Sequence, residues 1–172
     1  VTPLHDNGNA IAIQPDSSIV FAGMARVTNV TSFDICVGRL HQDGTLDSTF
    51  GTNGYVILDY NGFTDYCYDV DLQPDGKIVV TGAVGISAPN TEFFVMRLNT
   101  NGSYDTSFGG TGKVLIPLTT GAEYARKALI QPDGKIVLCG YSIQSSIDYA
   151  TLIRLNDNGS LDTTFGTGGI AQ

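Results

Sequence analysis

The sequence predicts an all-β protein, a β-propeller-type array of three four-stranded antiparallel blades. One pattern occurs three times, with its arginines Arg39, Arg97 and Arg154 spaced 58 and 57 residues apart. Each repeat holds four short segments with strand patterning, separated by turn signals, and no segment has apolar residues at helical spacing over a helical length. Four strands in about 57 residues is the size of one propeller blade.

The 172 residues are expected to form one unit of three repeats, at approximately 1–61, 62–120 and 121–172. A hydrophobic fraction of 42% with only 15% charged residues indicates a folded chain. The spacing is kept when the C-terminus is joined to the N-terminus. We therefore expect the ends to fall at an arbitrary point in the repeat cycle, as in one unit of a longer protein.

The middle repeat shows the four strand segments best. The first two flank Pro74-Asp75-Gly76, a hairpin signal because proline presets φ and glycine accepts a positive φ. The first repeat has Ser17-Ser18 in place of the Gly-Lys of the others, which puts only that turn in doubt. The expected strands of the middle repeat are 69–73, 77–82, 92–98 and 112–118.

Three spaced elements recur together in these repeats: Gln-Pro-Asp-Gly-Lys-Ile-Val, then Arg-Leu, then Gly-x-Leu-Asp-x-x-Phe-Gly-x-x-Gly. At these residues the chain resembles the delta-60 repeat family, a group of propeller-like repeats of bacterial, often secreted or surface, proteins. The resemblance covers essentially the whole chain. It implies a fold and a location outside the cell or at its surface, but no reaction.

The fourth strand of the third repeat is divided between the two chain ends. Complete versions lie at 55–60 and 113–118, and the joined ends read like the second of these. Pro3 even matches Pro117, and proline suits the outer edge of a blade. The expected assembly strand consists of Val1, Thr2, Pro3, Leu4, Gly169, Ile170, Ala171 and Gln172.

Three blades are few for a closed propeller, which usually has four to eight, and an open stack exposes sheet faces and edges. Two copies in a six-bladed ring, tandem units in a longer chain, and a head-to-tail fibre would each resolve this. A compact three-blade monomer is a less favourable alternative. The expected partner is thus the chain itself, with glycans or surface proteins as further candidates.

The repeated Asp/Asn-Gly turns offer oxygen ligands of the kind that calcium prefers. They lack a closing bidentate Glu, so capping of the turn by its own Asp or Asn is the favoured interpretation. Calcium is the alternative, and no other cofactor is expected. The candidate ligands are Asp43, Asp47, Asn101, Asp105, Asp157, Asn158 and Asp162.

The three repeated arginines lie in apolar strands, each eight residues before a repeated aspartate. This pattern predicts structural ion pairs, or arginines bonded to loop carbonyls, with an anion site as the alternative. Cys36, Cys67 and Cys139 occupy unrelated repeat positions, and no CxxC pair is present. We expect them to be small buried hydrophobes in strands, and a single disulfide stays open.

No catalytic residue is predicted. His5 and His41 fall at unrelated repeat positions, and no Gly-x-Ser-x-Gly sequence occurs. The pair Asp65 and Asp69 could serve a glycosidase, although acidic residues at turns and strand edges explain it better. Nine Lys and Arg residues and a net charge of −8 argue against nucleic-acid binding. No apolar run approaches the length of a membrane helix.

The sequence therefore predicts a non-enzymatic, extracellular or cell-surface, structural or adhesive module that assembles head to tail or within a longer repeat protein. A carbohydrate- or protein-binding propeller acting as a discrete oligomer is the first alternative. A polysaccharide hydrolase or lyase is the second. Contacts are expected at sheet edges and at three variable loops, 25–33, 84–91 and 142–149.

Overall fold

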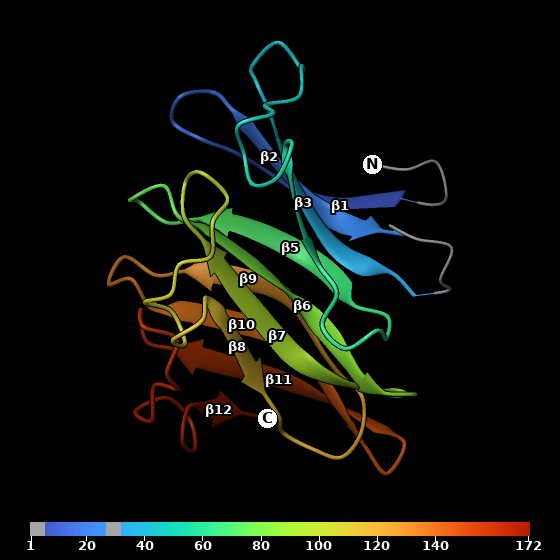
Figure 1. Cartoon of the computed structure of the whole chain (residues 1–172). Coiled ribbons are helices and arrows are strands. Elements are labelled where there is room, and N and C mark those ends of the chain that lie inside the picture. The colour runs from blue at the N-terminus through green and yellow to red at the C-terminus, as the bar shows by residue number, and fades with distance from the viewer. Residues whose placement is uncertain (1–5, 27–31) are drawn as a thin grey trace.

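The computed structural model describes residues 6–26 and 32–172, which form twelve strands in three four-stranded antiparallel sheets (Figure 1). Within each sheet, strands that are consecutive in the chain pair with each other. The described residues contain no helix of the length and apolarity needed to cross a membrane. The predicted fold class, three four-stranded antiparallel blades without helix, is confirmed.

The strands of sheet 1 are β1 (Asp6–Ile13), β2 (Ile19–Ala25), β3 (Asp34–Leu40) and β4 (Tyr55–Leu58). Sheet 2 contains β5 (Tyr66–Leu72), β6 (Ile78–Ser87), β7 (Asn90–Leu98) and β8 (Lys113–Ile116). Sheet 3 contains β9 (Glu123–Ile130), β10 (Ile136–Gln144), β11 (Ile147–Leu155) and β12 (Ile170–Ala171).

The sheets stack in chain order, with sheet 1 at the top of Figure 1, sheet 2 below it and sheet 3 behind and partly below sheet 2. One apolar cluster, which includes Val37 and Phe94, fills the space between sheets 1 and 2. A second, with Phe93 and Leu138, lies between sheets 2 and 3. Sheet 2 is therefore covered on both faces, whereas sheets 1 and 3 each have one face that no other described sheet covers.

The covering of the faces explains the burial pattern of the strands. β6 and β7 are almost entirely buried, as expected for strands with sheets on both sides. β1 alternates instead: Ala10 and Ala12 pack on the first cluster, while Ile11 and Ile13 are exposed.

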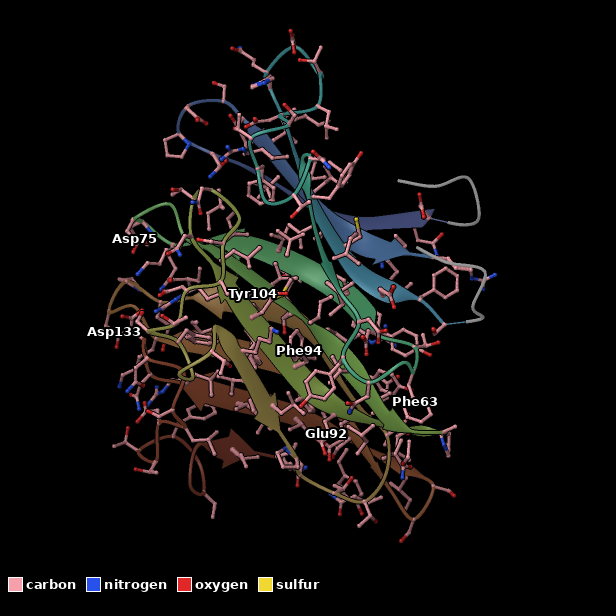
Figure 2. All side chains as sticks on the ribbon, in the orientation of Figure 1. Phe63, Asp75, Glu92, Phe94, Tyr104 and Asp133 are labelled. Carbon is pink, nitrogen blue, oxygen red and sulfur yellow. The ribbon has the colours of Figure 1, made fainter. Side chains whose placement is uncertain are left out.

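The first hairpin of each sheet closes at the predicted turn. Gly76 and Gly134 have φ of 83° and 82° there, and Figure 2 shows Asp75 and Asp133 on the same side of the stack. The doubtful turn of the first repeat forms as well. Ser17 adopts φ of 68° in place of glycine, and Asp16 Oδ1 accepts the N–H of Ser18 at 2.9 Å.

The prediction is wrong for two of the three expected variable loops. Strands β6 and β7 fill most of 84–91, and β10 and β11 fill most of 142–149, leaving tight hairpin tips. At the second tip Ser145 and Ser146 have φ of 50° and 65°. A two-residue hairpin turn requires such positive φ values, although glycine or asparagine usually supplies them. Most of the remaining expected loop, 25–33, lies outside the described residues.

The C-terminal half of the predicted divided strand forms β12. Ile170 and Ala171 pair with Ile153 and Leu152, so β12 has two residues where β4 and β8 have four. The expected N-terminal half, Val1–Leu4, lies outside the described residues. The outer edge of β11 beyond Leu152 therefore has no paired strand among the described residues.

Candidate assembly faces

Each repeat places an arginine of its third strand over a phenylalanine and against an aspartate. Arg97 Nε donates to Asp105 Oδ2 at 2.7 Å, and its guanidinium carbon lies 4.8 Å from the ring centroid of Phe108. We call each such set an Arg–Asp–Phe unit. The three units are Arg39–Asp47–Phe50, Arg97–Asp105–Phe108 and Arg154–Asp162–Phe165.

The turn after the aspartate fixes this geometry. Asp105 Oδ1 accepts the N–H of Ser107 at 3.1 Å and its hydroxyl at 2.7 Å, while the main-chain N–H of Phe108 donates to the Asp105 carbonyl. Gly109 follows with φ of 59°. The aspartate thus caps its own turn and holds the arginine with the other carboxylate oxygen, Oδ2.

In the first two units the arginine also reaches the next repeat. Arg39 Nη1 donates to the main-chain carbonyl oxygen of Thr100 at 2.6 Å, and Arg97 Nη1 donates to that of Asp157 at 2.6 Å. Thr100 and Asp157 hold the same position in consecutive repeats. The arginine therefore joins one sheet to the turn of the following sheet.

A main-chain bond accompanies each of these contacts. Gly51 N–H donates to the Asn101 carbonyl, and Gly109 N–H donates to the Asn158 carbonyl, both at 2.9 Å. Thr100 and Asn101 directly precede Gly102, and Asp157 and Asn158 directly precede Gly159. Each junction between sheets thus has two donors on the earlier repeat and two carbonyl acceptors on the later one.

The glycine of the accepting turn allows the two backbones to approach. A Cβ at Gly102 would lie 2.7 Å from Gly51 N, and one at Gly159 would lie 2.9 Å from Val114 Cγ2. Gly44, the equivalent residue of the first repeat, has no atom within 4 Å of such a Cβ. The accepting turn of the first repeat is therefore open where the other two are packed.

The third Arg–Asp–Phe unit keeps its internal contacts and lacks the outer ones. Arg154 Nε donates to Asp162 Oδ2 at 2.7 Å, but no hydrogen bond among the described residues joins Arg154 to another repeat. Gln131 Oε1 is buried without a hydrogen-bond partner among the described residues, whereas Oε1 of Gln73, the equivalent residue of the second repeat, accepts from Arg97. By equivalence, the acceptors for Arg154 and Gly166 would be the carbonyls of Gln42 and Asp43.

The uncovered face of sheet 1 presents apolar side chains, and we call it the N-terminal end face. Ile11 and Ile13 are 70% and 66% exposed, and Leu46 and Ile57 are also exposed. The equivalent residues of sheet 2 all pack on the cluster between sheets 1 and 2. They are Val70, Leu72, Tyr104 and Leu115.

The uncovered face of sheet 3 is the C-terminal end face. Leu129 is 62% and Leu152 is 38% exposed, although Val37 and Val95, the equivalents of Leu152, are fully buried. Phe165 is half-buried, whereas its two counterparts in the other Arg–Asp–Phe units are inaccessible. Both end faces therefore carry residues of the type that forms the core elsewhere in this chain.

The aspartates of the units are held in the ionised form. The Thr49 hydroxyl and Arg39 lower the pKa of Asp47 to about 2. Burial opposes the shift at Asp105, but hydrogen bonds from Ser107 and the charge of Arg97 lower its pKa to about 2 as well. At Asp162 a hydrogen bond from the Lys135 ammonium is the largest contribution to a pKa well below the usual range.

The residues proposed as calcium ligands lie in the turns of these units. Asp43, Asn101 and Asn158 each accept the N–H and the hydroxyl of the residue two positions on. The three aspartates of the units bond to arginine, and Asp157 Oδ1 lies 2.7 Å from Arg97 Nη1. All seven side chains thus have partners within the protein.

All three cysteines are free. Cys36 and Cys67 are buried as expected, but the prediction is wrong for Cys139, which is exposed on β10. Its equivalents Ala22 and Thr81 are fully buried. Cys139 is exposed because it lies on the C-terminal end face, which no other described sheet covers.

An open groove of about 770 Å³ runs along the outer junction of the first and second repeats. Tyr55 and Tyr104 line it together with the Asn101–Ser103 turn and Thr49. Sequence reasoning anticipated exposed sheet faces in an open stack, but it missed this groove and did not identify the residues of the two end faces.

A family model described as a domain of unknown function (DUF5122) beta-propeller matches residues 14–50, 73–108 and 131–165. Each matched segment ends at the phenylalanine of an Arg–Asp–Phe unit. No curated protein matches the chain. The match supports a propeller-type repeat family, and the narrower delta-60 resemblance stays a prediction. The chain belongs to the DUF5122 β-propeller family.

Proposed function

We propose that this chain is a non-enzymatic structural or adhesive module, located outside the cell or at its surface, that builds larger propeller-type arrays. The C-terminal end face of one unit docks on the N-terminal end face of the next. The next unit is a second copy or further repeats of a longer chain. The observation that carries this proposal is the half-junction at each end: donors at Arg154 and Gly166, and an open accepting turn at Gly44.

The apolar content of the end faces supports the same docking. Burying one isoleucine side chain contributes about 1.5–3 kcal/mol, so Ile11 and Ile13 alone would supply a substantial part of an interface. Exposed apolar patches on soluble proteins usually mark interaction sites. Because the partner face carries Leu129 and Leu152, both sides of the junction have apolar surface to bury.

The short strand β12 supports strand completion at the same junction. It pairs with two residues of β11, and the next residues of that edge, Thr151 and Ala150, correspond to paired positions Phe94 and Phe93 in sheet 2. An added strand segment would extend the ladder as in strand-addition complexes. We expect deletion of Val1–Leu4 to weaken assembly and to leave the units soluble.

Light scattering coupled to size exclusion tests the proposal. The 18.2 kDa chain should give particles of two or more copies, and both Arg154→Ala and the double variant Ile11→Ser with Ile13→Ser should shift them to one copy. Phe63→Ser is the matched control, since Phe63 is 39% exposed but lies in a loop away from the end faces.

A wild-type chain that stays at one copy at every concentration would contradict self-docking. Assembly that survives both end-face variants would show that another surface is used. Conversely, loss of assembly in Phe63→Ser alone would place the contact at the loop that follows β4.

A carbohydrate- or protein-binding role is the second candidate, and the groove at Tyr55 and Tyr104 favours it. Tyrosine faces flanked by amide and hydroxyl groups suit ligands with both polar and apolar surfaces. Tyr55→Ala should abolish glycan capture on an array of immobilised polysaccharides and leave the oligomeric state unchanged. Equal glycan capture by the wild type and by Tyr55→Ala would reject the groove as the binding site.

A further inference from the structure

Three aspartates meet where the first repeat ends and the second begins. Asp34 opens β3, Asp59 follows β4 and Asp65 precedes β5, and each offers a carboxylate oxygen within 4.8 Å of the other two. The β3–β4 register sets Ile35 opposite Leu58, so Asp34 lies directly across from Asp59. The three side chains therefore come together through sheet register and one short connection.

This arrangement is unfavourable without a positive partner. Like charges directly opposite each other in a sheet are destabilising. Asp34 is 7% exposed, and its Oδ1 is buried without a hydrogen-bond partner. No ion pair found among the described residues includes Asp34, Asp59 or Asp65. Burial, with the nearby Asp59 carboxylate, raises the pKa of Asp34.

The equivalent junction between sheets 2 and 3 shows which of these carboxylates has a structural role. Glu123, the equivalent of Asp65, accepts the N–H groups of Leu118 and Thr119, just as Asp65 accepts those of Tyr60 and Gly85. The carboxylate at this position therefore caps the connection between sheets at both junctions. In the second repeat Pro117 stands where the first has Asp59, so the facing carboxylate pair exists only in the first.

We propose that Asp34, Asp59 and Asp65 bind a calcium ion. Calcium binds oxygen ligands at about 2.3–2.6 Å, so two ligands of one ion can lie up to about 5 Å apart, as these oxygens do. The unpartnered oxygen of Asp34 then gains a ligand bond, and the opposed charges are neutralised. Asp59 is exposed, which leaves room for water to complete the six to eight oxygens that calcium takes.

The ligand set favours calcium over other common ions. Zinc and other transition metals prefer nitrogen and sulfur ligands, and the cluster has neither. Magnesium requires a near-ideal octahedron and keeps most of its water, whereas a site on a sheet edge and a loop suits the flexible coordination of calcium. This site does not depend on docking of the end faces.

Calorimetric titration with calcium chloride and thermal unfolding test the site on the full chain after dialysis against a chelator. At a pH of about 8.5, where carboxyl groups are ionised, we expect one calcium ion per chain with a dissociation constant of about 1 mM or below. Asp34→Asn and Asp59→Asn should each weaken binding at least about tenfold. Glu92→Gln, at the position equivalent to Asp34, is the matched control, and Figure 2 places Glu92 on the same side of the stack as Phe63.

Thermal unfolding separates a calcium site from a purely structural cluster. In chelator, Asp34→Asn and Asp59→Asn should unfold at a higher temperature than the wild type, because a charge repulsion is removed. In calcium the order should reverse, and this reversal supports the site. The same order in both media, absence of calcium binding at about 1 mM, or binding retained by both variants would overturn it. Stronger binding of magnesium than of calcium would overturn the assignment of the ion.

Discussion

The guanidinium of Arg97 binds both the carbonyl oxygen and the carboxylate of Asp157, at 2.6 and 2.7 Å, and so joins the second repeat to the third. The arginine is 1% exposed, yet every one of its bonds is to a group in a turn or to a neighbouring side chain. Burial of a charge is tolerated here because each side of the guanidinium is occupied. Arg154 holds the same position with one side open.

Arg97→Ala should lower the free energy of unfolding by about 3–5 kcal/mol, the usual cost of breaking a buried ion pair. Arg154→Ala should cost about 1 kcal/mol or less in the single copy, since Arg154 is partly exposed and bonds only within its own repeat. Urea unfolding of both variants checks this. Equal losses would mean that the bonds between repeats add little to the stability of the stack.

Gly102→Ala should destabilise the chain more than Gly44→Ala does. Both glycines have nearly the same φ, 86° and 85°, so both variants pay a similar backbone cost of about 1–2 kcal/mol. Only at Gly102 would the methyl group also meet main-chain atoms, at 2.7 Å, which adds about 1–3 kcal/mol. The difference in urea midpoint therefore isolates packing at the junction, and identical midpoints would contradict the close approach.

Cys139 should be the one rapidly labelled thiol of the folded chain. Burial raises the pKa of Cys36 to about 11 and that of Cys67 to about 12, and both residues are buried. Labelling with a maleimide followed by mass measurement should give one adduct quickly and three only after unfolding. Docking at the C-terminal end face should slow that first adduct, and an unchanged rate in assembled material would place the contact elsewhere.

Acid should destabilise the junctions within a defined range. The pKa values of Asp47 and Asp105 are about 2 in the folded chain and rise toward the ordinary 3.8 on unfolding. Their contribution is therefore fully present above about pH 4 and is lost as the pH falls toward 2. Urea midpoints measured across this range should fall. In Asp105→Asn the fall should be shallower, and an unchanged slope would exclude Asp105 as a source.

The repeated features of the fold were predictable because they are written three times. Period, hairpin turns and the pairing of each arginine with an aspartate follow from residues that recur at fixed spacing. The tip at Ser145 and Ser146 was missed because neither residue is a usual turn signal for positive φ. The exposure of Leu129 and Cys139 was missed because a strand pattern does not tell whether another sheet follows.

The aspartate cluster was missed for a different reason. Asp34 and Asp59 lie in the first repeat and Asp65 at the start of the second, and they meet through the pairing of β3 with β4 and the loop after β4. In the sequence, calcium was an alternative only for the repeated turns, and the side chains of those turns are bonded within the protein. A ligand set assembled by register has no signature in local spacing.

The arginine and glycine contacts between sheets have unlike sides, since both donors lie on the earlier repeat and both carbonyl acceptors on the later one. This gives the molecule a polarity, so two copies meeting through the same face would set donor against donor. Any array built this way has a single direction, and each added unit leaves the same free end that the previous one had. Whether growth stops then depends only on the rotation per sheet: a sum of one full turn closes a ring, and any other value continues as a filament.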